Sequence, residues 1–196
     1  MRFCDAAAGH IYMDGKDYHS MKPEELRKHI AMVPQQVNLF SGTIRENLLL
    51  ADPDADDQTL MEAVKEAGLL KFVQSLEKGL NSDVGNAGAS LSGGQRQKIG
   101  IARALLSKAE YMIFDEATSS VDPESEKEIW ETIGHLAHTR TLIIISHRMS
   151  SVRGADCIYV LKDGRVAQQG DHETLMAQDG LYHELVIRQQ AMEVAE

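Results

Sequence analysis

The sequence predicts an α/β protein in which a mostly parallel sheet carries an inserted helical segment. Residues 111–114 and 141–145 are apolar at consecutive positions, as expected for strands that are buried on both faces of a parallel sheet. A charged, amphipathic pattern typical of a helix separates these two segments. Residues 43–107 show only helical signals, so we expect a helical insertion between two strands of the sheet.

Turn signals predict a pair of antiparallel strands near each end of the chain. Asp14-Gly15 and Asp163-Gly164 each lie between two segments with a strand pattern. Asp-Gly strongly favours a tight turn between antiparallel strands. Between the two hairpins, residues 30–33 form a further predicted strand.

Capping residues indicate where the predicted helices begin. Ser20 is expected to cap a short helix over residues 22–29, with a proline in its first turn. Asp122 begins an amphipathic helix that runs to about residue 137, and Asp171 begins the first of two C-terminal helices. Residues 57–70 repeat apolar side chains at spacings of three and four, which predicts another helix. Residues 1–5 resemble the end of a helix.

Composition excludes several classes of function. The chain has 30 acidic and 20 basic residues and a formal net charge of -10, so broad attraction to nucleic acid or anionic lipid is not expected. Cys4 and Cys157 lie far apart, which indicates neither a metal site nor a disulfide framework. No apolar run approaches the roughly 20 residues of a membrane span.

A glycine-rich turn, Leu91-Ser92-Gly93-Gly94-Gln95, runs directly into a predicted helix. Paired glycines allow a close backbone approach, and a helix N-terminus offers N–H groups and the positive end of its dipole. Ser92 and Gln95 would add side-chain donors. The turn therefore predicts an anion site, although an ordinary loop before a surface helix fits the same five residues.

Carboxylates follow the predicted strand 111–114. Asp115 and Glu116 lie at its carboxyl end, where open α/β sheets place ligands. Because adjacent strand residues point to opposite sides, one carboxylate would bind a cation while the other orients or deprotonates water. The alternative is a capping pair for the next turn. His147 follows the strand 141–145 and would donate to a terminal phosphate, or serve a structural role. We assign the other seven histidines to the surface.

Together these segments resemble, in chain order, the nucleotide-binding domain of an ATP-binding-cassette (ABC) transporter. The segments that carry the resemblance are Gln35 after residues 32–34, the turn Leu91 to Gln95, the strand ending in Asp115-Glu116, the segment 119–122, and Ser146-His147. Residues 39–48 and 163–182 resemble the exporter branch, in which this domain follows a transmembrane region. The resemblance implies a P-loop NTPase-like core and covers nearly the whole chain.

The resemblance implies a role for each matching residue. Asp115, in the Walker B strand, and Gln35, in the Q-loop, would assist Mg²⁺, while Glu116 would polarise the attacking water. His147 is the switch histidine for the γ-phosphate. Asp122, in the D-loop, would communicate across a dimer. Residues Ser92, Gly93, Gly94 and Gln95 would bind ATP held mainly by a second ABC domain.

The implied partners are that second domain and the transmembrane domain of an exporter, with no nucleic acid. The implied location is the cytoplasmic face of a membrane. The implied domain organisation is a partial ABC ATPase domain over residues 1–196, with a core α/β subdomain at 1–36 and 108–196 and a helical signature subdomain at 37–107.

The sequence departs from the family in two places. No Gly-x-x-x-x-Gly-Lys-Ser/Thr pattern occurs, and the one Gly-Lys pair, Gly15-Lys16, lies in a predicted hairpin. We therefore expect the chain to begin just after the Walker A loop, to lack the N-terminal strands, and to be inactive alone. Asn86 and Ala87 stand where exporters usually carry Glu and Arg, which puts the usual coupling contact in doubt.

Two other functions fit the sequence. The chain would serve as a non-catalytic partner if it offers only its signature turn to a complete ABC domain. The second alternative is a non-transport ABC ATPase. Three features argue against it: the acidic charge, the exporter-like segment 39–48 and the lack of coiled-coil heptads.

Overall fold

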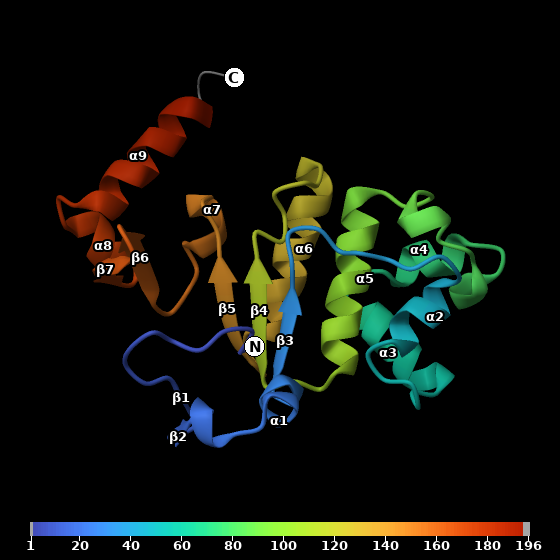
Figure 1. Ribbon diagram of the computed structural model, residues 1–196. Coiled ribbons are helices and arrows are strands. Elements are labelled where there is room, and N and C mark those ends of the chain that lie inside the picture. Colours follow the sequence, from blue (N-terminus) through green and yellow to red (C-terminus); the bar gives the residue numbers. More distant parts are fainter. Residues whose placement is uncertain (1, 194–196) are drawn as a thin grey trace. The chain divides into compact units, whose positions relative to one another are not determined.

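The computed structural model describes residues 2–193, and the chain forms two compact units, Met1–Ile143 and Ile144–Glu196. Unit 1 contains the first strands, the helical segment and most of the sheet (Figure 1). Unit 2 contains an antiparallel strand pair and the C-terminal helices. The predicted α/β class with a parallel sheet is confirmed. The subdomain boundaries at residues 37 and 107 stay a prediction.

The first hairpin forms as predicted. Strands β1 (Tyr12–Met13) and β2 (Lys16–Asp17) pair antiparallel around Asp14-Gly15. Both turn residues have positive φ, 50° for Asp14 and 75° for Gly15, as a type I′ turn requires. Lys16 therefore lies in a strand and not at the start of a helix, so this Gly-Lys pair does not form a phosphate loop.

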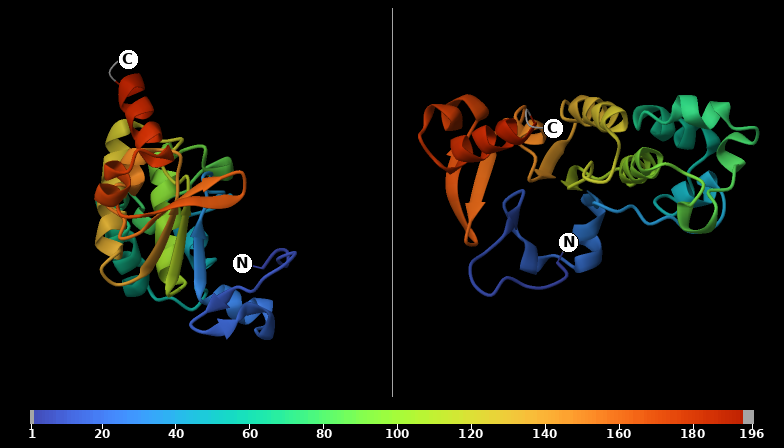
Figure 2. Two further views of the ribbon diagram at one scale, coloured as in Figure 1. Left: turned by 90° about the vertical axis from the view of Figure 1, so that its left-hand side faces the viewer. Right: turned by 90° about the horizontal axis from the view of Figure 1, so that it is seen from above.

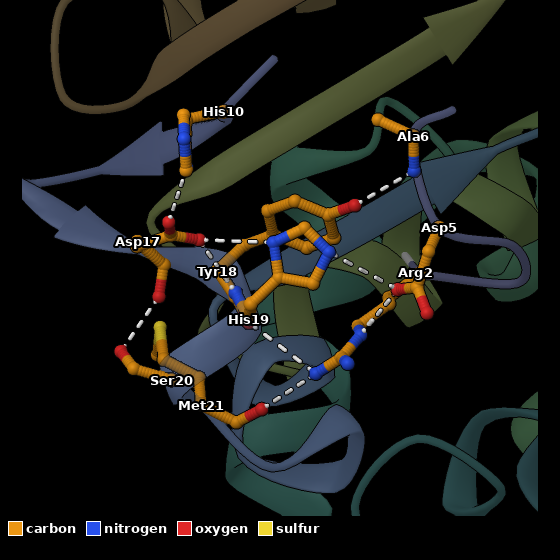
Figure 3. Close-up of polar contacts among 9 residues, drawn as sticks. All are labelled: Arg2, Asp5, Ala6, His10, Asp17, Tyr18, His19, Ser20 and Met21. Atoms are coloured by element: carbon orange, nitrogen blue, oxygen red, sulfur yellow. Dashed lines mark hydrogen bonds and ion pairs between the residues drawn. The ribbon is translucent and has the colours of Figure 1, made fainter. Parts of the chain in front are cut away.

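Polar contacts hold residues 2–6 against the segment that follows the hairpin (Figure 3). Arg2 donates to the backbone oxygen of Met21 at 3.0 Å, and the hydroxyl of buried Tyr18 accepts from the backbone N–H of Ala6 at 2.9 Å. Residues 2–5 are irregular, so the expected helix end is wrong there; residue 1 lies outside the described residues. The remaining contacts of this network join Asp5, His10, Asp17, His19 and Ser20.

Helix α1 (Pro23–Lys28) begins one residue after Lys22, which makes no side-chain capping bond. The predicted cap, Ser20, lies instead in the 3₁₀ turn η1 (Tyr18–Ser20), where its hydroxyl donates to the Asp17 carbonyl at 2.6 Å. That local bond keeps the hydroxyl from the helix N-terminus, so the predicted capping role of Ser20 is wrong. Pro23 occupies the first turn, as predicted.

The central sheet has the order β3 (Ile30–Val33), β4 (Tyr111–Asp115) and β5 (Thr141–Ile145). β3 and β4 are parallel, with Val33 opposite Phe114. Helices lie along one face of the sheet (Figure 2). Alternate residues of β3 and β4 are buried on one face of these two strands. The buried residues of this face are Ala31, Val33, Met112 and Phe114.

The opposite face of the sheet is exposed in part. Met32 is 37% exposed and Ile143 46%, and Ile113, opposite Met32, is half-buried. The prediction that β4 and β5 are buried on both faces is therefore wrong for the described residues. Consecutive apolar residues indicate that both faces of a strand are apolar. They do not indicate which other segments cover each face, because that depends on tertiary contacts.

The segment between β3 and β4 is helical, as predicted. Its elements are α2 (Ile44–Leu49), α3 (Asp57–Glu66), α4 (Leu70–Ser75), the 3₁₀ turns η2 (Gly79–Asn81) and η3 (Asn86–Gly88), and α5 (Gly93–Leu106). The predicted helix 57–70 ends earlier, at Glu66. Gly68 adopts a left-handed φ of 69° and the N–H of Leu69 donates back to Val64, a glycine-stopped helix end.

One face of α5 holds the segment that follows β3. Gln97 Nε2 donates to the Pro34 carbonyl at 3.0 Å, and Arg103 Nε donates to the Asn47 carbonyl at 2.7 Å. Between them, Gly100 lies so close to Val37 that an added Cβ would approach Cγ2 of Val37 to 2.5 Å. Residues three apart share a helix face, so these contacts form one continuous seam.

Helix α6 (Pro123–Leu136) begins at Asp122 and ends within one residue of the predicted position. Unit 2 contains α7 (Met149–Val152), β6 (Ile158–Lys162), β7 (Arg165–Gly170), α8 (His172–Ala177) and α9 (Leu181–Glu193). β6 and β7 pair antiparallel, and Asp163 and Gly164 have φ of 50° and 73°, which confirms the second hairpin. Asp171 caps α8, as predicted. None of the described helices is long and apolar enough to span a bilayer.

We predict that Gly100→Ala destabilises the chain by about 1–3 kcal/mol, because the new methyl group overpacks the contact with β-branched Val37. Gly134→Ala is the matched control, since nothing lies within 4 Å of its added Cβ in α6. That change raises stability by about 0.5–1 kcal/mol through helix propensity. Urea unfolding of both variants measures the difference, and Val37→Ala is expected to rescue Gly100→Ala. A stabilising Gly100→Ala would contradict the close packing.

Candidate functional site

The glycine-rich turn forms the N-terminus of α5, and the side chain of Ser92 caps the helix. Ser92 Oγ accepts from the Gln95 N–H at 3.1 Å, and Gln95 Oε1 accepts from the Ser92 N–H at 2.9 Å. This reciprocal capping box follows from Ser and Gln at a spacing of three, a signal that the sequence analysis did not use. The arrangement fixes the direction in which the first turn presents its N–H groups.

Glycine is required at the two positions after the cap. An added Cβ would lie 2.9 Å from the Ser120 carbonyl oxygen at Gly93 and 2.5 Å from the Ser125 side chain at Gly94. These serines flank Asp122, so the start of α5 packs against the start of α6. The structure thus brings the predicted turn and the predicted D-loop residue together.

The α5 N-terminus retains the chemistry of an anion site. Neither Gly93 nor Gly94 has a hydrogen-bond partner for its N–H among the described residues. The exposed hydroxyl of Ser92 lies beside them. Unpaired first-turn N–H groups and the helix dipole together favour a negatively charged ligand.

A second group of predicted residues meets at the carboxyl edge of the sheet. Because Val33 of β3 lies opposite Phe114 of β4, the residues that follow these strands leave the sheet at the same edge. Asp115 is half-buried there, and exposed Gln35 follows Pro34, whose carbonyl is held by α5. Their carboxylate and amide oxygens are ligands of the kind that Mg²⁺ accepts from protein, alongside waters and phosphates.

Glu116 has an unusual backbone conformation. Its φ is 48°, in the left-handed region that non-glycine residues rarely occupy, at a cost of about 1–3 kcal/mol. The backbone turns sharply here, and the Glu116 carbonyl accepts from the Ser119 N–H at 3.1 Å. The next two residues, Ala117 and Thr118, are buried. Strain of this kind concentrates at functional positions.

His147 lies two residues beyond β5, in unit 2, and its side chain is exposed. The backbone around it is shaped by Ser146, whose Oγ accepts from the Arg148 N–H at 3.0 Å.

The predicted site residues of unit 1 fall into two groups. The first contains Gln35, Asp115 and Glu116; the second contains Ser92, Gly93, Gly94, Gln95 and Asp122.

A model of the family described as ABC transporter matches residues 1–119. The chain belongs to the ABC transporter family. In the solved structure titled as a bacterial Atm1-family ABC exporter with ATP bound, the similar region covers 96% of this chain and 33% of that one, with 38% identity and a TM-score of 0.90.

Curated ABC proteins are similar over nearly all of this chain. An ATP-dependent lipid A-core flippase of Colwellia psychrerythraea is 41% identical over 94% of this chain and 31% of its own length. The human mitochondrial potassium channel ATP-binding subunit is 42% identical over 96% of this chain and 26% of its own length. The chain thus spans about a third or less of these relatives.

The loop in which this ABC chain carries Asn86 and Ala87 packs against the segment before α2. Ser41 Oγ lies 3.3 Å from Asn86 Oδ1, and an added Cβ at Gly88 would lie 2.9 Å from Leu39. Ala87 has φ of 52° and ψ of 31°, a left-handed conformation without local turn chemistry to favour it. The sequence showed the departure from the family, but not that it carries strain.

The electrostatics of the site follow from helix capping. The Ser125 N–H donates to Asp122 at 2.9 Å, and this bond holds the pKa of the Asp122 carboxyl below its usual value. The same cause lowers the pKa of the caps Asp56 and Asp171. No cluster of three or more His, Cys, Asp or Glu side chains suited to a metal occurs among the described side chains of residues 2–192. One carboxylate and one amide fit Mg²⁺ that is also bound by nucleotide phosphates.

We predict that Ala87→Gly raises the free energy of unfolding by about 1 kcal/mol, because glycine adopts a left-handed backbone without a Cβ penalty. Ala89→Gly, at φ of -61°, is the control and lowers stability by about 0.5 kcal/mol through chain entropy. Denaturant titration compares the two. Equal losses in both variants would show that Ala87 is unstrained.

We predict a pH-dependent difference between the parent chain and Asp122→Asn. Asparagine also caps helices but does not titrate. The folded pKa of Asp122 is lowered from 3.8, so its stabilisation is fully present well above pH 3.8 and is lost as pH falls through 3.8 and then through the lower folded value. Melting temperatures measured from pH 7 to pH 3 should show the parent losing stability relative to the variant from about pH 5 downward. A constant difference over this range would refute the assignment.

Proposed function

We propose that this chain is part of the ATP-binding and ATP-hydrolysing domain of an exporter-type ABC transporter. The observation that carries the proposal is the start of α5, where Gly93 and Gly94 leave their N–H groups without described partners and have no room for a side chain. A nucleotide phosphate is the anion that fits such a site in a chain of this family. The neighbouring Ser92 hydroxyl would add a further donor.

In the proposed mechanism, the residues that follow the strands of the central sheet have separate tasks. Gln35 and Asp115 would hold Mg²⁺, which neutralises phosphate charge, and Glu116 would orient the attacking water. His147 would donate a hydrogen bond to the γ-phosphate. Catalysis then depends on positioning and charge stabilisation, for which one well-placed donor contributes about a hundredfold or more in rate.

The proposed partner at the α5 N-terminus is a second ABC domain. In this arrangement Ser92, Gly93, Gly94 and Gln95 contact ATP held mainly by the partner's phosphate loop, and Asp122 lies at the interface. The chain would work at the cytoplasmic face of a membrane, with the transmembrane domain of an exporter. The similarity to a flippase and to an ABC exporter supports this assignment.

We predict that Ser92→Ala abolishes the ability of this chain to complete a partner's site. The assay pairs the chain with a complete ABC domain whose own signature serine is replaced, and measures phosphate release. Thr43→Ala is a matched control, because Thr43 also forms a capping box, on α2, outside the proposed site. Each change removes about 1 kcal/mol of capping. Hydrolysis that falls equally in both variants would assign only a structural role to Ser92.

A second function, a non-catalytic ABC partner, is favoured by one observation: the α5 N-terminus is formed, whereas the 196 residues contain no Walker A pattern. We predict negligible ATP turnover by the chain alone. Phosphate release by the purified chain, compared with its Glu116→Gln variant, tests this. An ordinary transporter rate that Glu116→Gln abolishes would contradict the prediction and show that these residues suffice for catalysis.

A further inference from the structure

Unit 2 contains a cavity that the proposed ATP chemistry does not use. Its volume is about 300 Å³, and it is lined by residues of α7, α8 and α9, together with the residue that follows α7. These helices are seen in orange and red in Figure 1. Met149, Met176 and Val186 supply an apolar wall, and methionine side chains adapt readily to different ligand shapes.

The polar groups of the cavity include two basic side chains. Arg153 and His172 line it, and no carboxylate does so among the described lining residues. Arg153 makes no ion pair with the side chains that the structure describes, those of residues 2–192. The nearby carboxylate of Asp171 is engaged as the α8 cap, where it accepts from the Thr174 N–H at 2.7 Å. In a chain with a net charge of -10, a cavity lined by two basic side chains and no described carboxylate is distinctive.

Tyr182 contacts the ring of His172. The Nδ1 of His172 lies 2.9 Å from the hydroxyl of Tyr182, and the two rings meet edge to face at 5.8 Å. Burial raises the pKa of the Tyr182 phenol, while the positive charge of Arg153 acts in the opposite direction, which places that charge near the same hydroxyl. When the phenol donates to Nδ1, the imidazole Nε2 carries the proton and is a donor. His172 is half-buried, and its side chain lines the cavity.

We propose that this cavity binds a small amphiphilic anion, with a carboxylate head on Arg153 and His172 and a short alkyl chain against Met149, Met176 and Val186. The volume lies at the lower end of the range for small-molecule sites, which limits the ligand to a short chain. A charge-assisted bond from the guanidinium would fix the head, and burial of the methylene groups would add affinity. The proposal does not rest on ATP binding in unit 1.

The test titrates the full chain, labelled at its methionine methyl groups, with octanoate and follows the NMR spectrum. We expect saturable shifts of the Met149 and Met176 signals, whereas Met61 of α3, in unit 1, stays unchanged. Octanol, which lacks the charge, and acetate, which lacks the chain, should each bind at least about tenfold more weakly than octanoate.

Arg153→Gln should weaken octanoate binding at least about tenfold. Both Arg153 and the control residue Arg188 are exposed, and Arg188 of α9 does not line the cavity, so Arg188→Gln should leave the affinity unchanged. Equal binding of octanol and octanoate would show an apolar cavity without anion selectivity. Equal losses in the two arginine variants would show general charge attraction, and the absence of methionine shifts would exclude the cavity. Each of these outcomes would overturn the proposal.

Discussion

The close packing of α5 is the constraint on which the rest of unit 1 depends. Three glycines of this helix, at positions 93, 94 and 100, lie where an added Cβ would approach another residue to between 2.5 and 2.9 Å. Such approaches require glycine, because real Cβ atoms do not tolerate them. Gln97 and Arg103 add hydrogen bonds along the same helix. Glycine lowers helix propensity at these positions, but it allows close contact with neighbouring segments.

A consequence is that both proposed site groups share one support. The N-terminus of α5 lies against the start of α6, near Asp122, and its middle holds the carbonyl of Pro34, next to Gln35. A shift of α5 would therefore displace the proposed anion-binding turn and the Gln35 segment together. The fully buried face of β3 and β4 anchors the strand edge from which Asp115 extends. The positions of the two groups are therefore coupled through the packing of α5.

Local chemistry accounts for what the sequence predicted correctly. The Asp-Gly turns, the Asp122 and Asp171 caps and the helical character of residues 44–106 each depend on interactions within a few residues. The predictions that were wrong depend on competing local hydrogen bonds or on contacts between segments distant in sequence. Ser20 bonds to Asp17 instead of capping α1, and exposure of Met32 depends on what covers the sheet. The contacts of Gly94 and Gly100 could not be predicted, because they join segments that are distant in sequence.

The conformation of Glu116 shows why a role for this residue could be proposed from the sequence whereas its backbone strain could not. Asp14 and Asp163 also have positive φ, but Asp-Gly turn chemistry favours that geometry. Glu116 is followed by alanine, so its left-handed backbone must be imposed by its surroundings. Buried Ala117 and Thr118 follow it, and the Thr118 hydroxyl lies 3.2 Å from Glu126 of α6. Packing of the residues after it thus helps to hold the Glu116 backbone in this conformation, and a change from carboxylate to amide alters the chemistry of the side chain without requiring the backbone to move.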